Sequence, residues 1–247
     1  MITLNNFRDL GTLSVGDKKI KDGMIYRSSV LFPKNDEDRE FIEKVKPDII
    51  FDFRCPEEVA DKPDFVPSGV KYRNIPVFDG DCYRHITVSK IAKLRSAVLH
   101  GKRSEIILRE KLQSYREMPF AKCYNEIFNA MDEGKSFIFH CTEGKDRTGI
   151  CDAIIEYCLG RMYDEILTEY LKSNVYRPAK DRHKYVYFGA SKTMLGFAAY
   201  AETTHEELLE ISINAAIKRY GSVDNYLYEM FGITEDRKKL WQKLYLE

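Results

Sequence analysis

Short apolar runs in the first 140 residues predict the strands of a central sheet. Three of them are rich in β-branched and aromatic residues, namely "PDIIFDF" (47–53), "VKYRNIPVF" (70–78) and "SFIFH" (136–140). The first and the third are predicted to be central strands. Helical periodicity lies between the runs, at 36–45 and 122–131. Strands that alternate with helices in this way predict an α/β fold around a mostly parallel sheet.

From residue 163 to residue 247 the pattern is almost wholly helical. The stretch Tyr163–Leu171 carries an apolar stripe at helical spacing, which is typical of a face packed against a core. Thr204 and Glu207 have the spacing of a capping box ahead of a further helix, and Thr234 is predicted to cap the last one. We therefore expect a helical C-terminal region that belongs to the same domain, which spans 1–247.

The segment 83–118 differs from its surroundings because it lacks a clear strand pattern and is basic. It contains nine lysines and arginines against three glutamates. We expect an inserted, helical and basic segment here.

Composition adds no global attraction to an anionic partner. Lysine plus arginine equals aspartate plus glutamate at 39 each, so neither nucleic acid nor an anionic membrane surface is an expected partner. The start, "MITLNNFRDL", has no basic segment followed by an apolar one, and no apolar run reaches the roughly 18 residues of a spanning helix. We expect a cytoplasmic protein without an integral membrane segment.

The six cysteines show neither CxxC pairing nor the spacing of metal ligands. Free thiols in a reducing compartment are therefore expected, and no metal or other cofactor is predicted. Cys123, Cys151 and Cys158 fall on apolar helical faces and are interpreted as packing residues.

The stretch "HCTEGKDRTG" (140–149) carries the candidate chemistry. It follows a predicted strand and opens a predicted helix that ends at Gly160, so loop N–H groups and the positive end of a helix dipole converge on one point. An anion is expected there, held by the planar fork of Arg147 and by the charge of Lys145. Such a field favours the thiolate form of a cysteine, which makes Cys141 a candidate nucleophile.

A thiolate beneath a bound phosphate can attack phosphorus and form a covalent intermediate without a metal. Thr148 could donate its hydroxyl to the sulfur when the sulfur leaves, or could simply be an N-terminal helix residue. A nucleotide-binding P-loop is excluded, because Asp146 follows the Gly144–Lys145 pair and Phe139 stands where the first glycine belongs. A non-catalytic phosphate-binding module and a rhodanese-like sulfurtransferase remain as alternatives.

The same stretch resembles the signature of bacterial cysteine-dependent protein tyrosine phosphatases, HCxxGKDRTG. Other segments resemble recurring segments of that branch and come in the same order: "NFRDLG" (within 5–11), "IYRSS" (25–29), "DFRCPEEV" (52–59), "YLKSN" (170–174) and "YGSVDNYL" (220–227). One departure is Phe53, where the family usually has leucine. The resemblance implies a phosphatase-type sheet flanked by helices, with 83–118 as a helical lid. It also implies a phosphorylated protein or a phosphoinositide as substrate, with phosphotyrosine in proteins expected first. Lys145 resembles the lysine of phosphoinositide phosphatases and indicates breadth, but alone it does not separate a lipid headgroup from a peptide.

The resemblance further implies the roles of the site residues. Cys141 is the nucleophile and Arg147 the phosphate clamp, while Asp52 and Arg54 are interpreted as support by ion pairing. The general acid stays open among Asp79, which follows a predicted strand, Asp146 in the loop, and Asp81. The remaining candidates bind the substrate through the loop or support it: Thr142, Glu143, Gly144, Lys145, Thr148, Gly149 and His140.

Overall fold

The structure is a computed structural model that describes residues 3–78, 102–176, 200 and 203–247, with the backbone alone for 102–107. Its helices and strands follow one another as β1 (Arg8–Asp9), β2 (Ser14–Val15), β3 (Lys18–Lys19), β4 (Ile25–Ser28), α1 (Asp36–Val45), β5 (Ile49–Asp52), α2 (Pro56–Asp61), β6 (Lys71–Asn74), α5 (Lys102–Glu117), α6 (Tyr124–Asp132), β7 (Phe137–His140), α7 (Asp146–Leu159), α8 (Tyr163–Leu171), α11 (Glu206–Tyr220), α12 (Val223–Phe231) and α13 (Glu235–Tyr245).

A five-stranded sheet in the order β1-β4-β7-β5-β6 forms the centre of the molecule. The pairs β4–β7, β7–β5 and β5–β6 are parallel, and only the short β1 runs antiparallel to its neighbour. The predicted mostly parallel sheet flanked by helices is therefore confirmed. In the register Asp52 lies opposite His140, so β5 and β7 end side by side. Whatever follows these two residues is brought to the same edge of the sheet.

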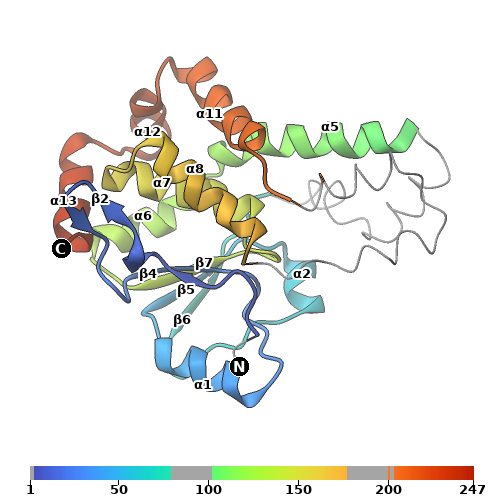
Figure 1. Cartoon of the computed structure of the whole chain (residues 1–247), viewed down its shortest axis with the longest axis vertical. Helices are drawn as coiled ribbons and strands as arrows, with labels where there is room; N and C mark the ends of the chain where they lie inside the picture. Colours follow the sequence, from blue (N-terminus) through green and yellow to red (C-terminus); the bar gives the residue numbers. More distant parts are fainter. Residues whose placement is uncertain (1–2, 79–101, 177–199, 201–202) are drawn as a thin grey trace.

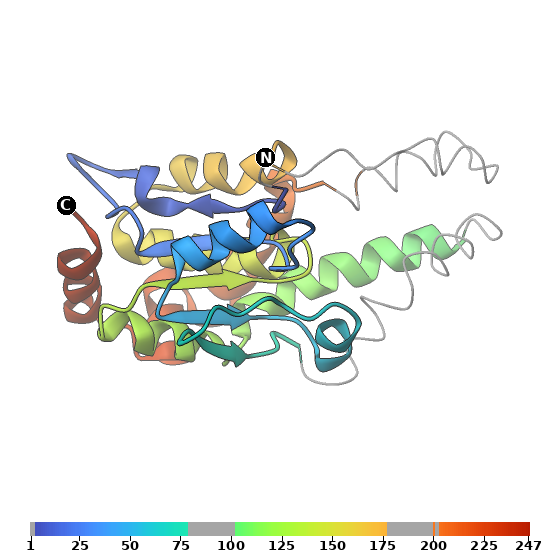
Figure 2. The same cartoon turned by 90° about the horizontal axis from the view of Figure 1, so that it is seen from below.

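Helices cover both faces of the sheet (Figures 1 and 2). The larger core lies on the side of α6, α7 and α13, where Phe51, Phe137 and Phe139 point. Ile50 and Ile138 alternate with these residues along the strands and point to the opposite face, against α1. Because both faces are covered, β5 and β7 are apolar on both sides up to the Asp52 and His140 that end them.

Most predicted elements are present with small shifts at their ends. The predicted helix 36–45 is α1, whose N-cap Asn35 accepts a hydrogen bond from the N–H of Asp38. The predicted strand 70–78 is shorter, because only 71–74 pairs with β5. Thr234 caps α13 as predicted, but Thr204 does not cap α11, which begins at Glu206 after His205. The N–H of Thr204 is held instead by the side chain of Asn174, which places this threonine before the helix rather than at its cap.

Of the predicted lid segment 83–118, the structure describes α5 and the residues that follow it. In Figure 1 and Figure 2, α5 extends away from the sheet, with its C-terminal end against the body. That end is held by α11, where the Ser212 hydroxyl donates to the Tyr115 carbonyl over 2.6 Å. The C-terminal end of α5 is thereby fixed next to the loop that follows β7.

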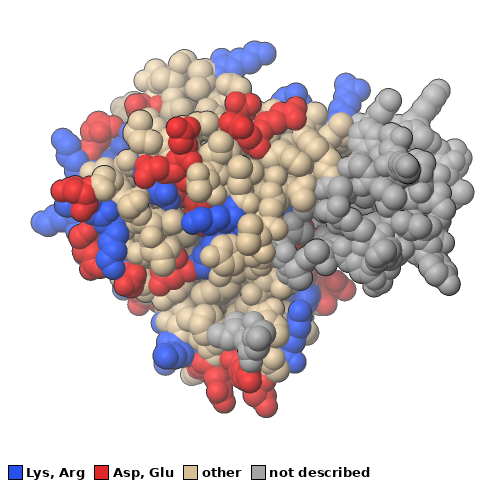
Figure 3. Space-filling view, in the orientation of Figure 1, with Lys and Arg blue, Asp and Glu red and all other residues tan. Residues whose placement is uncertain are grey.

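The face shown in Figure 3 carries acidic and basic side chains in mixture rather than a field of one sign. This matches the zero formal net charge of the chain. Among the described residues, no helix combines the length and the apolar character that crossing a bilayer requires.

Candidate active site

The loop after β7 contains the candidate chemistry and joins the strand directly to α7. Cys141 follows the strand and is only 2% exposed, and α7 begins at Asp146 with Arg147 in its first turn. Gly144 has φ +66°, and a Cβ atom there would lie 2.3 Å from the carbonyl oxygen of Ser28. Only glycine fits this turn. The predicted strand, loop and helix are thus present, with the N-terminus of α7 beneath the cysteine loop.

Arg147 is held in place by a carboxylate that the sequence did not single out. Its Nη1 lies 2.6 Å from Glu58 Oε2 and its Nη2 lies 2.9 Å from Glu58 Oε1, a two-pronged pair with both side chains buried. Burial alone would raise the pKa of Glu58, but the hydrogen bonds and charge of Arg147 lower it below its ordinary value. Thr142 also donates its hydroxyl to this carboxylate.

The path of the chain explains how Glu58 reaches the loop. Because β5 and β7 end together, the residues after Asp52 run beside Cys141, and Pro56 then starts α2. Glu58 sits in the first turn of α2, where its carboxylate also accepts the N–H of Cys55 over 3.1 Å. In the sequence, Glu58 stands three residues after the N-cap Cys55 and inside the segment "DFRCPEEV", but neither feature indicates a contact with Arg147.

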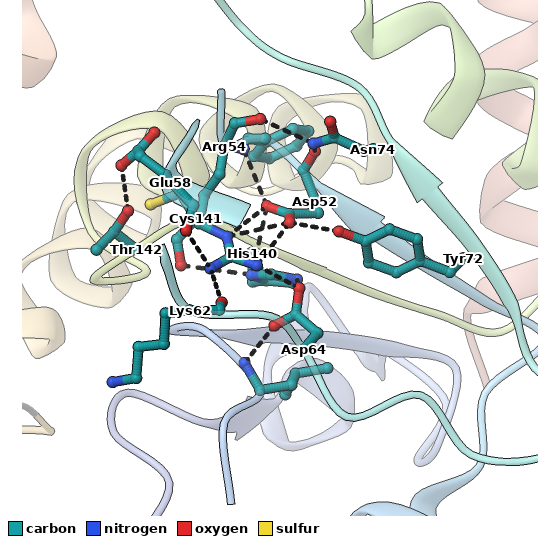
Figure 4. Close-up of polar contacts among 12 residues, drawn as sticks. Asp52, Arg54, Glu58, Lys62, Asp64, Tyr72, Asn74, His140, Cys141 and Thr142 are labelled. Carbon is teal, nitrogen blue, oxygen red and sulfur yellow. Dashed lines mark hydrogen bonds and ion pairs between the residues drawn. The ribbon is translucent and has the colours of Figure 1, made fainter. Parts of the chain in front are cut away.

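A buried ion-pair cluster supports the loop from the end of β5 (Figure 4). Arg54 donates from Nε and Nη2 to both oxygens of Asp52 over 2.8–3.0 Å and pairs with Asp64 over 2.5 Å. Tyr72 donates its hydroxyl to Asp52 over 2.7 Å. His140, which immediately precedes the cysteine, has Nε2 3.3 Å from Asp64. Asp52 and Arg54 therefore lie together next to the loop, as the ion-pairing interpretation expects.

The same cluster has the composition of a metal site, since ligand atoms of Asp52, Asp64 and His140 lie within 4.8 Å of one another. Its charges, however, are already balanced by protein groups. Burial would lower the pKa of His140, but the carboxylates of Asp64 and Asp52 raise it to about 9, so the imidazole is cationic at neutral pH. With Arg54 bound to both carboxylates, we interpret the cluster as an ion-pair network and assign no metal to it.

Asp146 lies at the start of α7 and is tied to α5. Tyr115 donates its hydroxyl to Asp146, and Tyr170 donates in turn to Tyr115 over 3.1 Å. Lys145 lies 3.3 Å from the Asp146 carboxylate. Burial would raise the pKa of Asp146, but Lys145, Lys111 and the Tyr115 hydroxyl hold it below its ordinary value. In this arrangement Asp146 accepts a hydrogen bond from α5.

Two other candidates, Thr148 and Gly149, are buried in the first turn of α7. The Thr148 hydroxyl has no hydrogen-bond partner within the described part of the chain, so its predicted donation to the Cys141 sulfur is not made here. Gly149 packs against the Tyr170 ring, where a Cβ atom would come within 2.8 Å. Both other candidate acids, Asp79 and Asp81, lie outside the described residues.

The comparisons with known proteins agree with this geometry. A sequence profile described as the tyrosine phosphatase family matches residues 1–247. The chain belongs to the tyrosine phosphatase family.

This phosphatase is similar to two curated bacterial proteins. A Cupriavidus necator protein, whose name proposes a tyrosine-protein phosphatase, is 29% identical over 234 residues, which cover 91% of this chain and 81% of that protein. The triple specificity protein phosphatase PtpB of Mycobacterium tuberculosis is 27% identical over 186 residues, 68% of this chain and 66% of PtpB. The crystal structure of Pseudomonas aeruginosa TpbA superposes with a TM-score of 0.33 at 15% identity, covering 74% of this chain and 91% of that one.

Family membership makes this chain an enzyme of the tyrosine phosphatase class, which acts on phosphorylated substrates. The structure adds a residue to the site that the sequence pattern did not indicate. The sequence named Cys141 and Arg147, and the structure adds Glu58 as the partner of the arginine.

Proposed function

We propose that this phosphatase hydrolyses phosphomonoesters through a cysteinyl-phosphate intermediate, without a metal, and that phosphotyrosine in proteins is its main substrate. The observation that carries the proposal is the Arg147 guanidinium, held by Glu58 in the first turn of α7 and within the loop that Cys141 opens. A guanidinium fixed in this way is a rigid, planar and permanently charged donor, the kind of group that binds a phosphoryl group. The broader activity toward other phosphoesters, including phosphoinositides, is supported by Lys145 and by the name of the PtpB relative.

The reaction proceeds in two displacements. The Cys141 thiolate attacks phosphorus, a P–S bond forms, and the P–O bond to the leaving group breaks while a general acid protonates the departing oxygen. Water then attacks the phosphoryl group, its proton passes to the conjugate base of that acid, and the P–S bond breaks. Inorganic phosphate and the thiolate are released. Arg147 and the loop amides stabilise the charge on the equatorial oxygens in both steps.

A substrate panel tests the proposal. We expect kcat/KM to be highest for phosphotyrosine peptides, with measurable hydrolysis of phosphoserine peptides and phosphoinositides and no sulfur transfer from thiosulfate. Binding of phosphate without turnover of any phosphoester would favour the non-catalytic module. Sulfur transfer without phosphate release would favour the rhodanese-like alternative.

For the proton donor we propose Asp79, with Asp146 as a loop anchor. The hydrogen bond from Tyr115 and the charge of Lys145 hold the pKa of Asp146 below its ordinary value, which disfavours the protonated form that a general acid needs. A proton donor matters most when the leaving oxygen is basic, as in phosphotyrosine, and little when it is an acidic phenol.

We therefore expect Asp79→Asn to lower kcat/KM by about 10²- to 10⁴-fold on phosphotyrosine but only slightly on an aryl phosphate with an acidic phenol. Asp146→Asn should lower both similarly, because it loosens the loop. Steady-state kinetics on the two substrates measure this difference. The assignment is reversed if the dependence on the leaving group appears in Asp146→Asn and is missing from Asp79→Asn.

A further inference from the structure

A second buried polar network lies beneath the cysteine loop, and none of the steps above uses it. It is built from three segments that are distant in sequence: 5–11, 25–29 and 170–174. Each contributes one polar side chain that is at most 1% exposed, Asn6, Arg27 and Ser173. These segments meet at one place in the fold, directly under the turn of the loop at Gly144.

Two of these side chains donate to the backbone of the loop. The Asn6 amide nitrogen lies 2.8 Å from the Gly144 carbonyl oxygen and 3.2 Å from the Glu143 carbonyl oxygen. The Arg27 Nη2 lies 2.9 Å from the same Gly144 oxygen. Two donors from different elements therefore converge on one carbonyl of the loop.

The donors are themselves held by buried partners. Arg27 pairs with Asp152 on α7, and both side chains are at most 1% exposed. Arg8 donates to the Asn6 side-chain oxygen and pairs with Glu169 over 2.6 Å. The two arginines and the two carboxylates balance in charge, which a buried set of ions requires. The amide of Asn6 is therefore fixed with its oxygen toward Arg8 and its N–H groups toward the loop.

The geometry of the peptide group gives this contact a consequence for the anion site. In a trans peptide the C=O and the following N–H point in opposite directions, and no described peptide bond is cis. A Gly144 carbonyl held toward Asn6 and Arg27 therefore turns the Lys145 N–H to the other side of the loop. The same holds for the Glu143 carbonyl and the Gly144 N–H.

Because residue 144 is a glycine, its backbone needs these hydrogen bonds to stay in one conformation. At φ +66°, Gly144 has no side chain to fix its backbone, and glycine moves between backbone conformations more freely than any other residue. Without donors beneath it, either peptide group could rotate and turn an N–H away from a bound oxyanion. A fixed backbone dipole is what stabilises charge at such a site.

We propose that Asn6 and Arg27 are positioning residues that lock the peptide groups of Glu143 and Gly144, so that the loop N–H groups face the phosphoryl oxygens. This inference rests on the proposed function, since it names the groups that shape its anion site. It also gives Asn6 and Arg27, which come from two segments distant in sequence, a common role in the reaction.

The test compares Asn6→Asp with a matched change in the same region. Asn6→Asp keeps an oxygen for Arg8 and removes both N–H donors to the loop. Asn174→Asp is the control, because Asn174 also bonds backbone groups, the Thr204 carbonyl over 2.9 Å and the Thr204 N–H over 2.8 Å, but none in the loop. Asn6→Ala is a second variant without the added charge. Folding is followed by circular dichroism and urea unfolding, and phosphate binding by calorimetry with inorganic phosphate.

We expect Asn6→Asp and Asn6→Ala to weaken phosphate binding about 10-fold and to lower kcat/KM about 10- to 100-fold. Asn174→Asp should leave both within about twofold, whatever it does to stability. Asn6 variants that lose unfolding free energy but keep phosphate affinity and kcat/KM would overturn the positioning role. Failure of the proposed function looks different, because the wild-type chain would then bind phosphate without hydrolysing any ester. In that case the phosphate affinities of the Asn6 variants, measured by calorimetry, decide whether Asn6 shapes the site. A wild-type chain that binds no phosphate refutes both proposals.

Discussion

Replacing Cys141 by serine should abolish turnover while leaving the fold and the affinity for inorganic phosphate nearly unchanged. A serine hydroxyl keeps its proton at neutral pH and is a far weaker nucleophile toward phosphorus than a thiolate. The change removes no part of the anion site, which consists of the loop amides and Arg147. We expect kcat to fall by about 10⁴-fold or more, as for other covalent nucleophiles.

The measurement is kcat on a phosphotyrosine peptide, together with phosphate affinity by calorimetry. Cys123→Ser is the matched control, because Cys123 is a half-buried thiol just ahead of α6 and outside the loop. It should retain activity within about twofold of the wild type. A Cys141→Ser variant that keeps substantial turnover would refute the covalent mechanism.

The sequence was most informative where the functional residues are contiguous. Cys141 and Arg147 stand in one ten-residue stretch between a strand and a helix, so local pattern alone places them in one loop. Glu58 pairs with Arg147 from 89 positions away, and Asn6 reaches Gly144 from 138 positions away. Contacts of this kind depend on how strands are ordered in the sheet, which periodicity does not determine.

Buried polar residues inside strands are a second kind of residue that could not be predicted from the sequence. Arg27 lies in β4, where the mixture of apolar and polar residues in "IYRS" gave no strand prediction. A charged residue in such a segment would ordinarily be placed at the surface. Arg27 is instead fully buried, because Asp152 on the neighbouring α7 neutralises it. The helix α1 was predictable because its apolar pattern fixes which face is buried, and β5 and β7 were predictable because a short apolar run is typical of a strand covered on both faces.

The second large effect is expected for Arg147→Lys, although the substitution conserves charge. Arg147 binds both oxygens of Glu58 and the Phe53 carbonyl from one planar group, and that pairing fixes the direction of the guanidinium. A lysine is a point charge on a flexible stem, which cannot bind both oxygens of Glu58 as a fork and so would not be held in one direction beside the loop. It would also leave the buried Glu58 with fewer hydrogen bonds. Since Arg147 acts on charge that develops in the transition state, we expect kcat/KM to fall by about 10³-fold.

Arg73→Lys is the control for this substitution, because Arg73 also makes a two-pronged contact with a glutamate, from Nε and Nη2 to Glu126 over 2.9 and 3.0 Å, at an exposed site. Losing this exposed contact should lower the free energy of unfolding only slightly and leave kcat/KM unchanged. The decisive comparison is kcat/KM and phosphate affinity in Arg147→Lys, Arg73→Lys and the wild type. If Arg147→Lys stays within a few-fold of the wild type, charge alone suffices at this position. The buried ion pair between Arg147 and Glu58 would then stabilise the fold without orienting the guanidinium toward the phosphoryl group.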